Sequence, residues 1–66
     1  MGGDTLGESL RRARERLGIT QEEVSYRSGV HATEVSRIEA GKRDPRVSTL
    51  ERLAQAVEVS PSDLLP

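Results

Sequence analysis

The chain has 66 residues, which is enough for one small domain and no more. Leu, Ile and Val together make up 15 residues, Tyr26 is the one aromatic residue, and there is no cysteine. Any core is therefore small and aliphatic, and disulfides and thiolate zinc sites are excluded. The formal net charge of −1 does not by itself indicate a nucleic-acid partner. The charges are unevenly distributed, because basic residues cluster at 11–16 and 42–46 whereas residues 47–66 carry −2.

Several classes of protein are excluded or disfavoured by what the sequence lacks. No apolar run is long enough for a spanning helix or a signal peptide, so we expect a soluble, cytoplasmic protein that does not contact a membrane. One histidine, no cysteine and no Gly-rich phosphate loop argue against an enzyme, a metal site, a cofactor or a small-molecule ligand. We interpret residues 1–66 as one domain, with residues 1–3 as a flexible lead-in.

Helix signals begin near the N-terminus, and no strand pattern of period two competes with them. Asp4 or Thr5 is placed to cap a first helix, and Thr5 with Glu8 forms the capping-box pattern. Gly18 ends this helix. The apolar residues that recur at helical spacing along it are Leu6, Leu10, Ala13 and Leu17.

Two short helices follow, predicted at 21–29 and 32–40. Thr20 and Glu23 form a second capping box, and Gly29 and Gly41 are the expected stops. Residues 42–47 are predicted to be a loop, because the Asp44-Pro45 pair disfavours helix.

Two further helices complete the chain. Ser48 and Glu51 form a third capping box, before a helix that presents Leu50, Leu53, Ala54 and Val57 on one side. Ser60-Pro61 starts a last short helix, which carries Leu64 and Leu65 and stops at Pro66. The pattern predicts an all-α protein, a compact five-helix bundle.

The second and third predicted helices, joined by a turn that contains glycine, form a helix-turn-helix candidate. On the third helix Val35 and Ile38 point nearly opposite a strip of small polar residues and one arginine. Such a strip suits the major groove of DNA, because Arg37 can donate two hydrogen bonds to a guanine and the Thr33 methyl group can contact a thymine methyl. On this helix alone, the pattern favours an ordinary solvated helix face over a DNA-reading one.

The residues of these segments resemble the Cro/lambda-repressor type of helix-turn-helix, the xenobiotic-response-element family. The resemblance runs from about Leu6 to Leu65. It rests on TQEEVSYRSGV at 20–30, VSRIEAGKR at 35–43 and VEVS at 57–60, with Pro45, Leu50, Leu53 and Ala54 between them. The resemblance implies a sequence-specific DNA-binding domain of a transcriptional regulator, of repressor type, whose third helix enters the major groove.

The resemblance also implies roles for individual positions. The residues implied to face base edges are Ala32, Thr33, Ser36 and Arg37. The residues implied to contact phosphates are Gln21, Lys42, Arg43 and Arg46. Arg27 is either a further phosphate contact or a solvated side chain, and His31 is expected either to help start the third helix or to contact a phosphate. Ala32 departs from the family, which often has a longer polar residue there, so more of the readout depends on Arg37, Thr33 and DNA shape.

Arg14 and Glu39 flank the apolar stripes of the first and third helices, where an unpaired charge would be costly. Family members often join these two positions in a salt bridge, and we expect that pair here. The alternative is that Arg14 extends to a DNA phosphate.

The resemblance implies a homodimer on a palindromic operator, since one recognition helix covers only a few base pairs of double-stranded DNA. Val47, Leu64 and Leu65 are the apolar residues expected at the dimer interface. The alternative function is a protein-interaction module, antitoxin-like or an adaptor to the transcription machinery, that uses the same bundle. Salt-sensitive DNA binding would separate these two functions.

Overall fold

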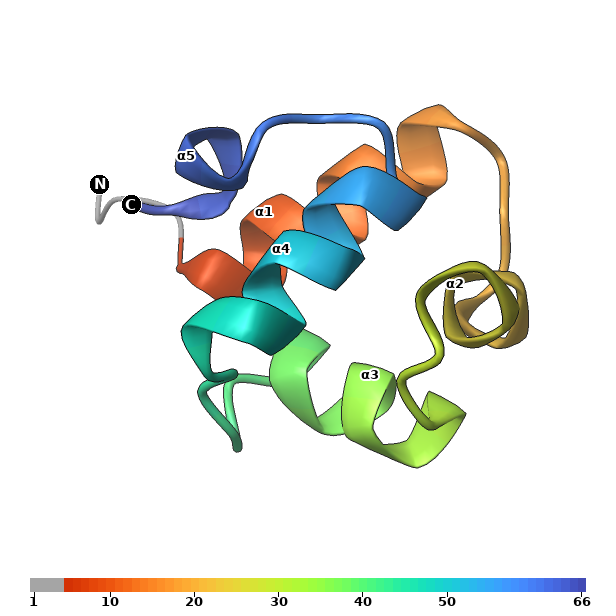
Figure 1. The fold of residues 1–66 in the computed structure, drawn as a ribbon, viewed down its shortest axis with the longest axis horizontal. Helices are drawn as coiled ribbons and strands as arrows, with labels where there is room; N and C mark the ends of the chain where they lie inside the picture. Colours follow the sequence, from red (N-terminus) through yellow and green to blue (C-terminus); the bar gives the residue numbers. More distant parts are fainter. Residues whose placement is uncertain (1–4) are drawn as a thin grey trace.

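A computed structural model describes residues 5–66, and within this range the chain is helical with no strand. The helices are α1 (Leu6–Arg16), α2 (Gln21–Ser28), α3 (Ala32–Glu39), α4 (Val47–Ala56) and α5 (Pro61–Leu64). Figure 1 shows α2 on the right, α3 below and α5 at the upper left. Helix α2 packs against α3 and α4, α1 packs against α3 and α5, and α4 also contacts α5. The predicted five-helix, all-α fold is confirmed.

The helix starts follow mainly from capping side chains. The Thr5 hydroxyl accepts a hydrogen bond from the Glu8 backbone N–H at 3.1 Å, and the Glu8 carboxylate accepts one from the Thr5 N–H at 3.0 Å. Thr20 caps α2 by accepting from the Glu23 N–H at 3.0 Å, but the predicted second capping box is only half formed, because the Glu23 carboxylate accepts from Arg27. The alternative cap, Asp4, and the expected lead-in at 1–3 lie outside the described residues.

The prediction of a capping box at Ser48 is wrong. The Leu50 N–H already donates to the Arg46 carbonyl at 2.8 Å, so α4 begins at Val47 and Arg46 is its cap residue. The Arg46 backbone is extended, with ψ 163°, and Val47 directly after it is the first helical residue. Ser48 consequently lies inside the first turn, where its side chain has no capping role.

The core is formed by aliphatic side chains from all five helices. Its largest fully buried members are Leu10, Val24, Val35, Ile38, Leu53, Val57 and Leu64. Leu17 was expected on the inner stripe of α1 but is exposed, because α1 ends at Arg16 and Leu17 is already its cap residue. Leu64 was expected at a dimer interface, and that prediction is wrong because α5 packs it against the rest of the core.

The expected pair of Arg14 and Glu39 is present and joins α1 to α3. Arg14 Nε donates to Glu39 Oε2 at 2.7 Å and Arg14 Nη2 donates to Glu39 Oε1 at 3.1 Å, the bidentate geometry that suits a guanidinium. Their side chains are 14% and 4% exposed. The hydrogen bond to Glu39 raises the pKa of Arg14 above its ordinary value, so Arg14 stays charged at any pH at which the protein is used.

Gln21 completes this arrangement. Gln21 Nε2 donates to Glu39 Oε1 at 3.0 Å, and Arg14 Nη1 donates to the Ile19 carbonyl oxygen at 2.8 Å. One carboxylate at the end of α3 therefore holds α1 and the start of α2 together.

We expect Glu39→Ala to lower the free energy of unfolding by about 3 kcal/mol, because it leaves Arg14 largely buried without its partner. The matched substitution is Glu34→Ala on the same helix, whose ion pair with Arg43 is more exposed and should cost about 1 kcal/mol or less. Thermal or urea unfolding of both variants measures the difference. Equal losses would contradict a structural role specific to Glu39.

Gly7 allows α1 to approach the end of α3 very closely. A Cβ atom at Gly7 would overlap the Ile38 carbonyl oxygen and would lie 2.7 Å from the Glu39 carbonyl oxygen. Both obstacles are backbone atoms, which cannot swing aside as a side chain would. The contact holds the C-terminal end of α3 against the first turn of α1.

Gly7→Ala should destabilise the protein by about 2–3 kcal/mol, although alanine is the better helix former, because the helices must move apart to admit the methyl group. Ser9→Ala, two residues further along α1, is the control and should change stability by less than about 1 kcal/mol. Chemical denaturation reports both values. A Gly7→Ala variant as stable as the original would show that α1 and α3 are not packed this closely.

Candidate nucleic-acid interface

The turn between α2 and α3 sets the angle at which α3 leaves the bundle. Gly29 has φ +76°, a left-handed conformation that glycine adopts at little cost. Val30 is buried, and its N–H donates to Ser28 Oγ at 3.1 Å. Val35 and Ile38 then hold α3 on the core by its inner face. The outer face of α3 is left to the solvent.

The outward strip, which we define as Thr33, Ser36 and Arg37, is exposed along this outer face. Ala32, the fourth residue expected to face bases, is half-buried at the start of α3. Within residues 5–66, Arg37 has no ion-pair partner, so its guanidinium is free to donate to a ligand. The structure thus brings three of the four candidate base-reading residues onto one accessible face.

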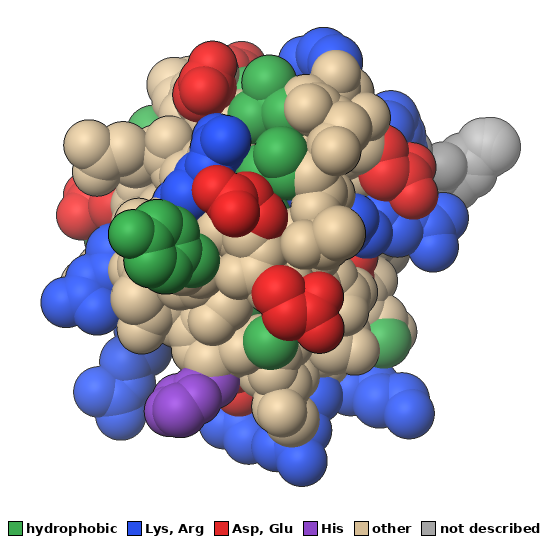
Figure 2. Space-filling view, turned by 90° about the vertical axis from the view of Figure 1, so that its right-hand side faces the viewer, with side chains coloured by type: hydrophobic (Ala, Val, Ile, Leu, Met, Phe, Trp, Pro, Cys, Tyr) green, Lys and Arg blue, Asp and Glu red, His purple; other side chains and the backbone are tan. Residues whose placement is uncertain are grey.

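Basic residues lie beside the outward strip. Lys42, Arg43 and Arg46, which we call the cationic rim, are exposed in the loop between α3 and α4. His31 is exposed at the position before α3. Figure 2 shows Lys and Arg side chains on either side of the histidine along the lower edge of the molecule, which is the side of α3 in Figure 1, while most of the acidic side chains on this face lie higher. Polarity of this kind suits a polyanion approaching α3.

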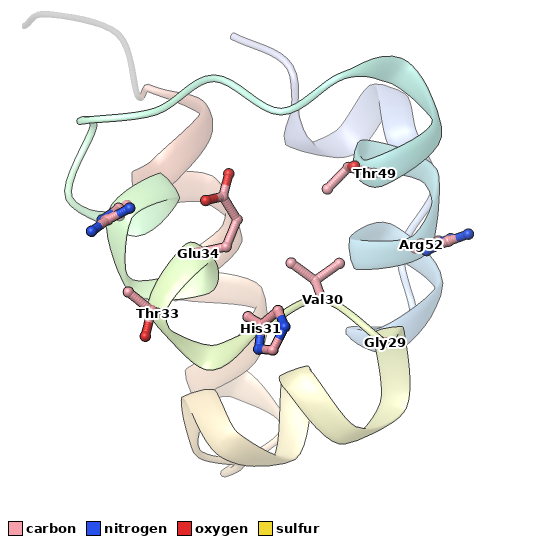
Figure 3. Close-up of a pocket in the computed structure, with 8 residues that line it drawn as sticks. Gly29, Val30, His31, Thr33, Glu34, Thr49 and Arg52 are labelled. Atoms are coloured by element: carbon pink, nitrogen blue, oxygen red, sulfur yellow. The ribbon is translucent and has the colours of Figure 1, made fainter.

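A hollow of about 500 Å³ separates α3 from α4 next to the outward strip. Figure 3 shows Thr33 and Glu34 on the α3 side of this hollow, Thr49 and Arg52 on the α4 side, and Val30 and His31 from the turn. Arg37 also lines it. Sequence reasoning missed Arg52, because only the packing of α4 against the turn brings it to this face.

Two of the expected phosphate ligands are engaged within the protein. Gln21 donates to Glu39, as described above. Arg27 Nε donates to Glu23 at 3.0 Å, and Arg27 Nη1 donates to the Ala56 carbonyl oxygen at 3.3 Å and lies 3.6 Å from a Glu58 oxygen. Arg27 thus stabilises the C-terminal end of α4, which favours positive charge. The structure therefore gives no support to Arg27 as a phosphate ligand.

A second hollow, of about 340 Å³, lies where α1, α2 and α3 meet. Arg11, Gln21 and Ser36 are among its lining residues. Arg11 was not singled out from the sequence as a site residue, although its position three residues before Arg14 places it on the same side of α1. The arrangement puts an exposed arginine beside the start of α2 and the outward strip.

Of the three residues expected at a dimer interface, two remain available. Val47 is 72% exposed and Leu65 is 51% exposed, in contrast to the buried Leu64. None of the five helices between residues 5 and 66 has the length and apolar composition that a bilayer-spanning segment needs. The same residues contain no group of three histidine or acidic side chains placed to hold a metal ion.

Comparison with known proteins supports this geometry. A family model described as "Helix-turn-helix domain" matches residues 5–65. The chain is 45% identical over 60 residues to the uncharacterized HTH-type transcriptional regulator y4dJ of Sinorhizobium fredii, which covers 91% of this chain and 78% of that protein. It is 40% identical over 57 residues to the HTH-type transcriptional repressor RghR of Bacillus subtilis, covering 85% of this chain but 42% of RghR.

Solved structures agree with the sequence relatives. The restriction-modification controller protein C.AhdI from Aeromonas hydrophila superposes with a TM-score of 0.87 at 30% identity, covering 91% of each chain. The P22 c2 repressor, in a complex with a synthetic operator, superposes with a TM-score of 0.89 at 30% identity, covering 96% of each chain. The chain therefore belongs to the helix-turn-helix domain family, in the Cro/lambda-repressor type that its sequence resembles.

Proposed function

We propose that this protein binds double-stranded DNA in a sequence-specific manner through α3 and regulates transcription, as a repressor. The observation that carries the proposal is the exposure of the outward strip on the second helix of a helix-turn-helix, with the cationic rim beside it. The P22 c2 repressor, whose fold this chain shares, is seen with operator DNA. A protein with this function acts in the compartment that contains the DNA.

The side chains of the outward strip have the chemistry needed to read bases. Arg37 presents parallel N–H donors that match O6 and N7 of a guanine, and Thr33 offers a methyl group to thymine. Ser36 is small, so it lets the helix approach the floor of the groove. Ala32 adds no polar contact, and DNA shape then contributes a larger share of the specificity.

The cationic rim supplies the phosphate contacts that position α3. Lys42 and Arg46 are exposed and, within residues 5–66, have no carboxylate partner. Arg11 and the N-terminal end of α2 form a second candidate phosphate contact on the other side of the outward strip. Gripping both flanks of the groove would fix the register of α3 on the duplex.

The proposal is tested by selecting bound duplexes from a random library and then measuring the binding of variants. Arg37→Ala should weaken binding to the selected duplex by about 1–3 kcal/mol and reduce the differences in affinity among related sequences. Lys42→Ala, which removes a phosphate contact only, should weaken binding to all duplexes by the same factor. It should also reduce the slope of log binding constant against log salt concentration by about one. An unchanged ranking of sequences in Arg37→Ala would refute its assignment to base reading. If no duplex is enriched, the function itself is refuted.

Two copies are proposed to bind a palindromic operator, because the strip on one α3 reads too few base pairs to be selective. Val47 and Leu65 are the exposed apolar side chains available for contact between copies.

On a duplex with two half-sites one helical turn apart, sedimentation should show two protein copies per DNA. Val47→Glu combined with Leu65→Glu should abolish cooperative loading while leaving one copy bound to a single half-site. A protein that loads one copy only, with or without these substitutions, would contradict the dimer proposal.

A further inference from the structure

Glu34 places a negative charge within the surface proposed to bind DNA. It lies next to Thr33 on α3 and lines the hollow shared with α4, and Figure 3 shows its carboxylate in the space between the two helices. Its side chain is 28% exposed, so it is held near the surface rather than extended into the solvent. A carboxylate in this position would repel the DNA phosphates, because it lies on the surface that they would approach.

The carboxylate has a specific partner in the cationic rim. Glu34 Oε2 lies 3.7 Å from Arg43 Nε, and the Arg43 side chain is 53% exposed. Within the described residues, Arg43 is the one member of the cationic rim that has an intramolecular carboxylate partner. The loop between α3 and α4 therefore presents two unpaired cations, Lys42 and Arg46, and one paired cation.

We propose that Glu34 competes with DNA phosphates for Arg43 and thereby lowers the affinity of the protein for every duplex without changing which sequence it prefers. An exposed ion pair of this kind is weak, so a phosphate can displace it. The displaced carboxylate then lies beside the phosphates and recruits a cation, which offsets part of the counterion release that drives binding. The inference rests on the DNA binding proposed above.

The test is Glu34→Gln, which keeps the shape of the side chain and removes its charge. Its binding to the selected duplex and to a scrambled duplex of the same length should tighten by about threefold in each case. The salt slope of binding should become steeper by up to about one. The ranking of selected sequences should stay unchanged. Thermal unfolding of the variant verifies that it is folded.

Two further variants identify the cause. Glu58→Gln removes a charge from another Glu–Arg ion pair of similar length, with Arg27 at 3.6 Å, just beyond the C-terminal end of α4, and it should leave DNA affinity unchanged. In the Arg43→Ala background, Glu34→Gln should no longer tighten binding, because the residue for which it competes is gone.

The outcomes separate this inference from the function on which it rests. If the original protein binds no duplex, the proposed function fails and this inference fails with it. If the original protein binds and Glu34→Gln binds equally well, the competition alone is overturned. The competition is also overturned by an equal gain in the Arg43→Ala background, which would show that Glu34 acts on the DNA directly. A changed ranking of sequences would assign Glu34 to base reading instead.

Discussion

The carboxylate of Glu39 is the point at which α1, α2 and α3 are joined. It accepts two hydrogen bonds from Arg14 and one from Gln21, and it is almost fully buried by them. A charge so placed is tolerated only when its partners surround it, and here each partner comes from a different helix. The close contact of Gly7 with the carbonyl groups at the end of α3 reinforces the same junction. Together they determine how far the outer face of α3 stands out from the bundle.

The charges of this protein are divided between structure and surface. Arg14 and Arg27 are engaged by carboxylates and carbonyl oxygens of the protein itself, so they add little to its external field. Lys42, Arg46 and Arg37 remain accessible on one side. A formal charge of −1 is therefore compatible with binding a polyanion, because the arrangement of cations over the binding face matters more than their sum.

The small aliphatic core limits how much apolar burial can stabilise the fold. The buried side chains are Leu, Val, Ile and Ala, and the single aromatic residue, Tyr26, is exposed. With so little apolar surface to bury, the helices depend on their caps and on the junction at Glu39 to adopt one arrangement. Gly29 also helps to fix this arrangement, in the turn between α2 and α3. Its left-handed backbone conformation redirects the chain, and glycine adopts that conformation without the steric strain that a Cβ atom would cause.

The helices, their order and the residues of the outward strip were all predictable from the sequence, because capping boxes, stop glycines and helical periodicity are local properties. The Arg14–Glu39 pair was expected from family resemblance and from the cost of leaving either charge alone. The local signal at Ser48 failed because α4 already begins at Val47, with Arg46 at the cap position and no side-chain cap hydrogen bond. The expectation for Leu64 failed because α5 packs this residue into the core.

The tertiary structure decided the partners of Arg27, which the sequence had placed among the phosphate ligands. Packing brings the Ala56 carbonyl oxygen and the Glu58 carboxylate to Arg27, whereas Arg37 has no such partner among residues 5–66. Packing also placed Glu34 against Arg43. It brought Arg52 to the hollow next to the outward strip. A long cationic side chain can reach many partners, and which one it meets depends on how helices distant in the sequence are packed together.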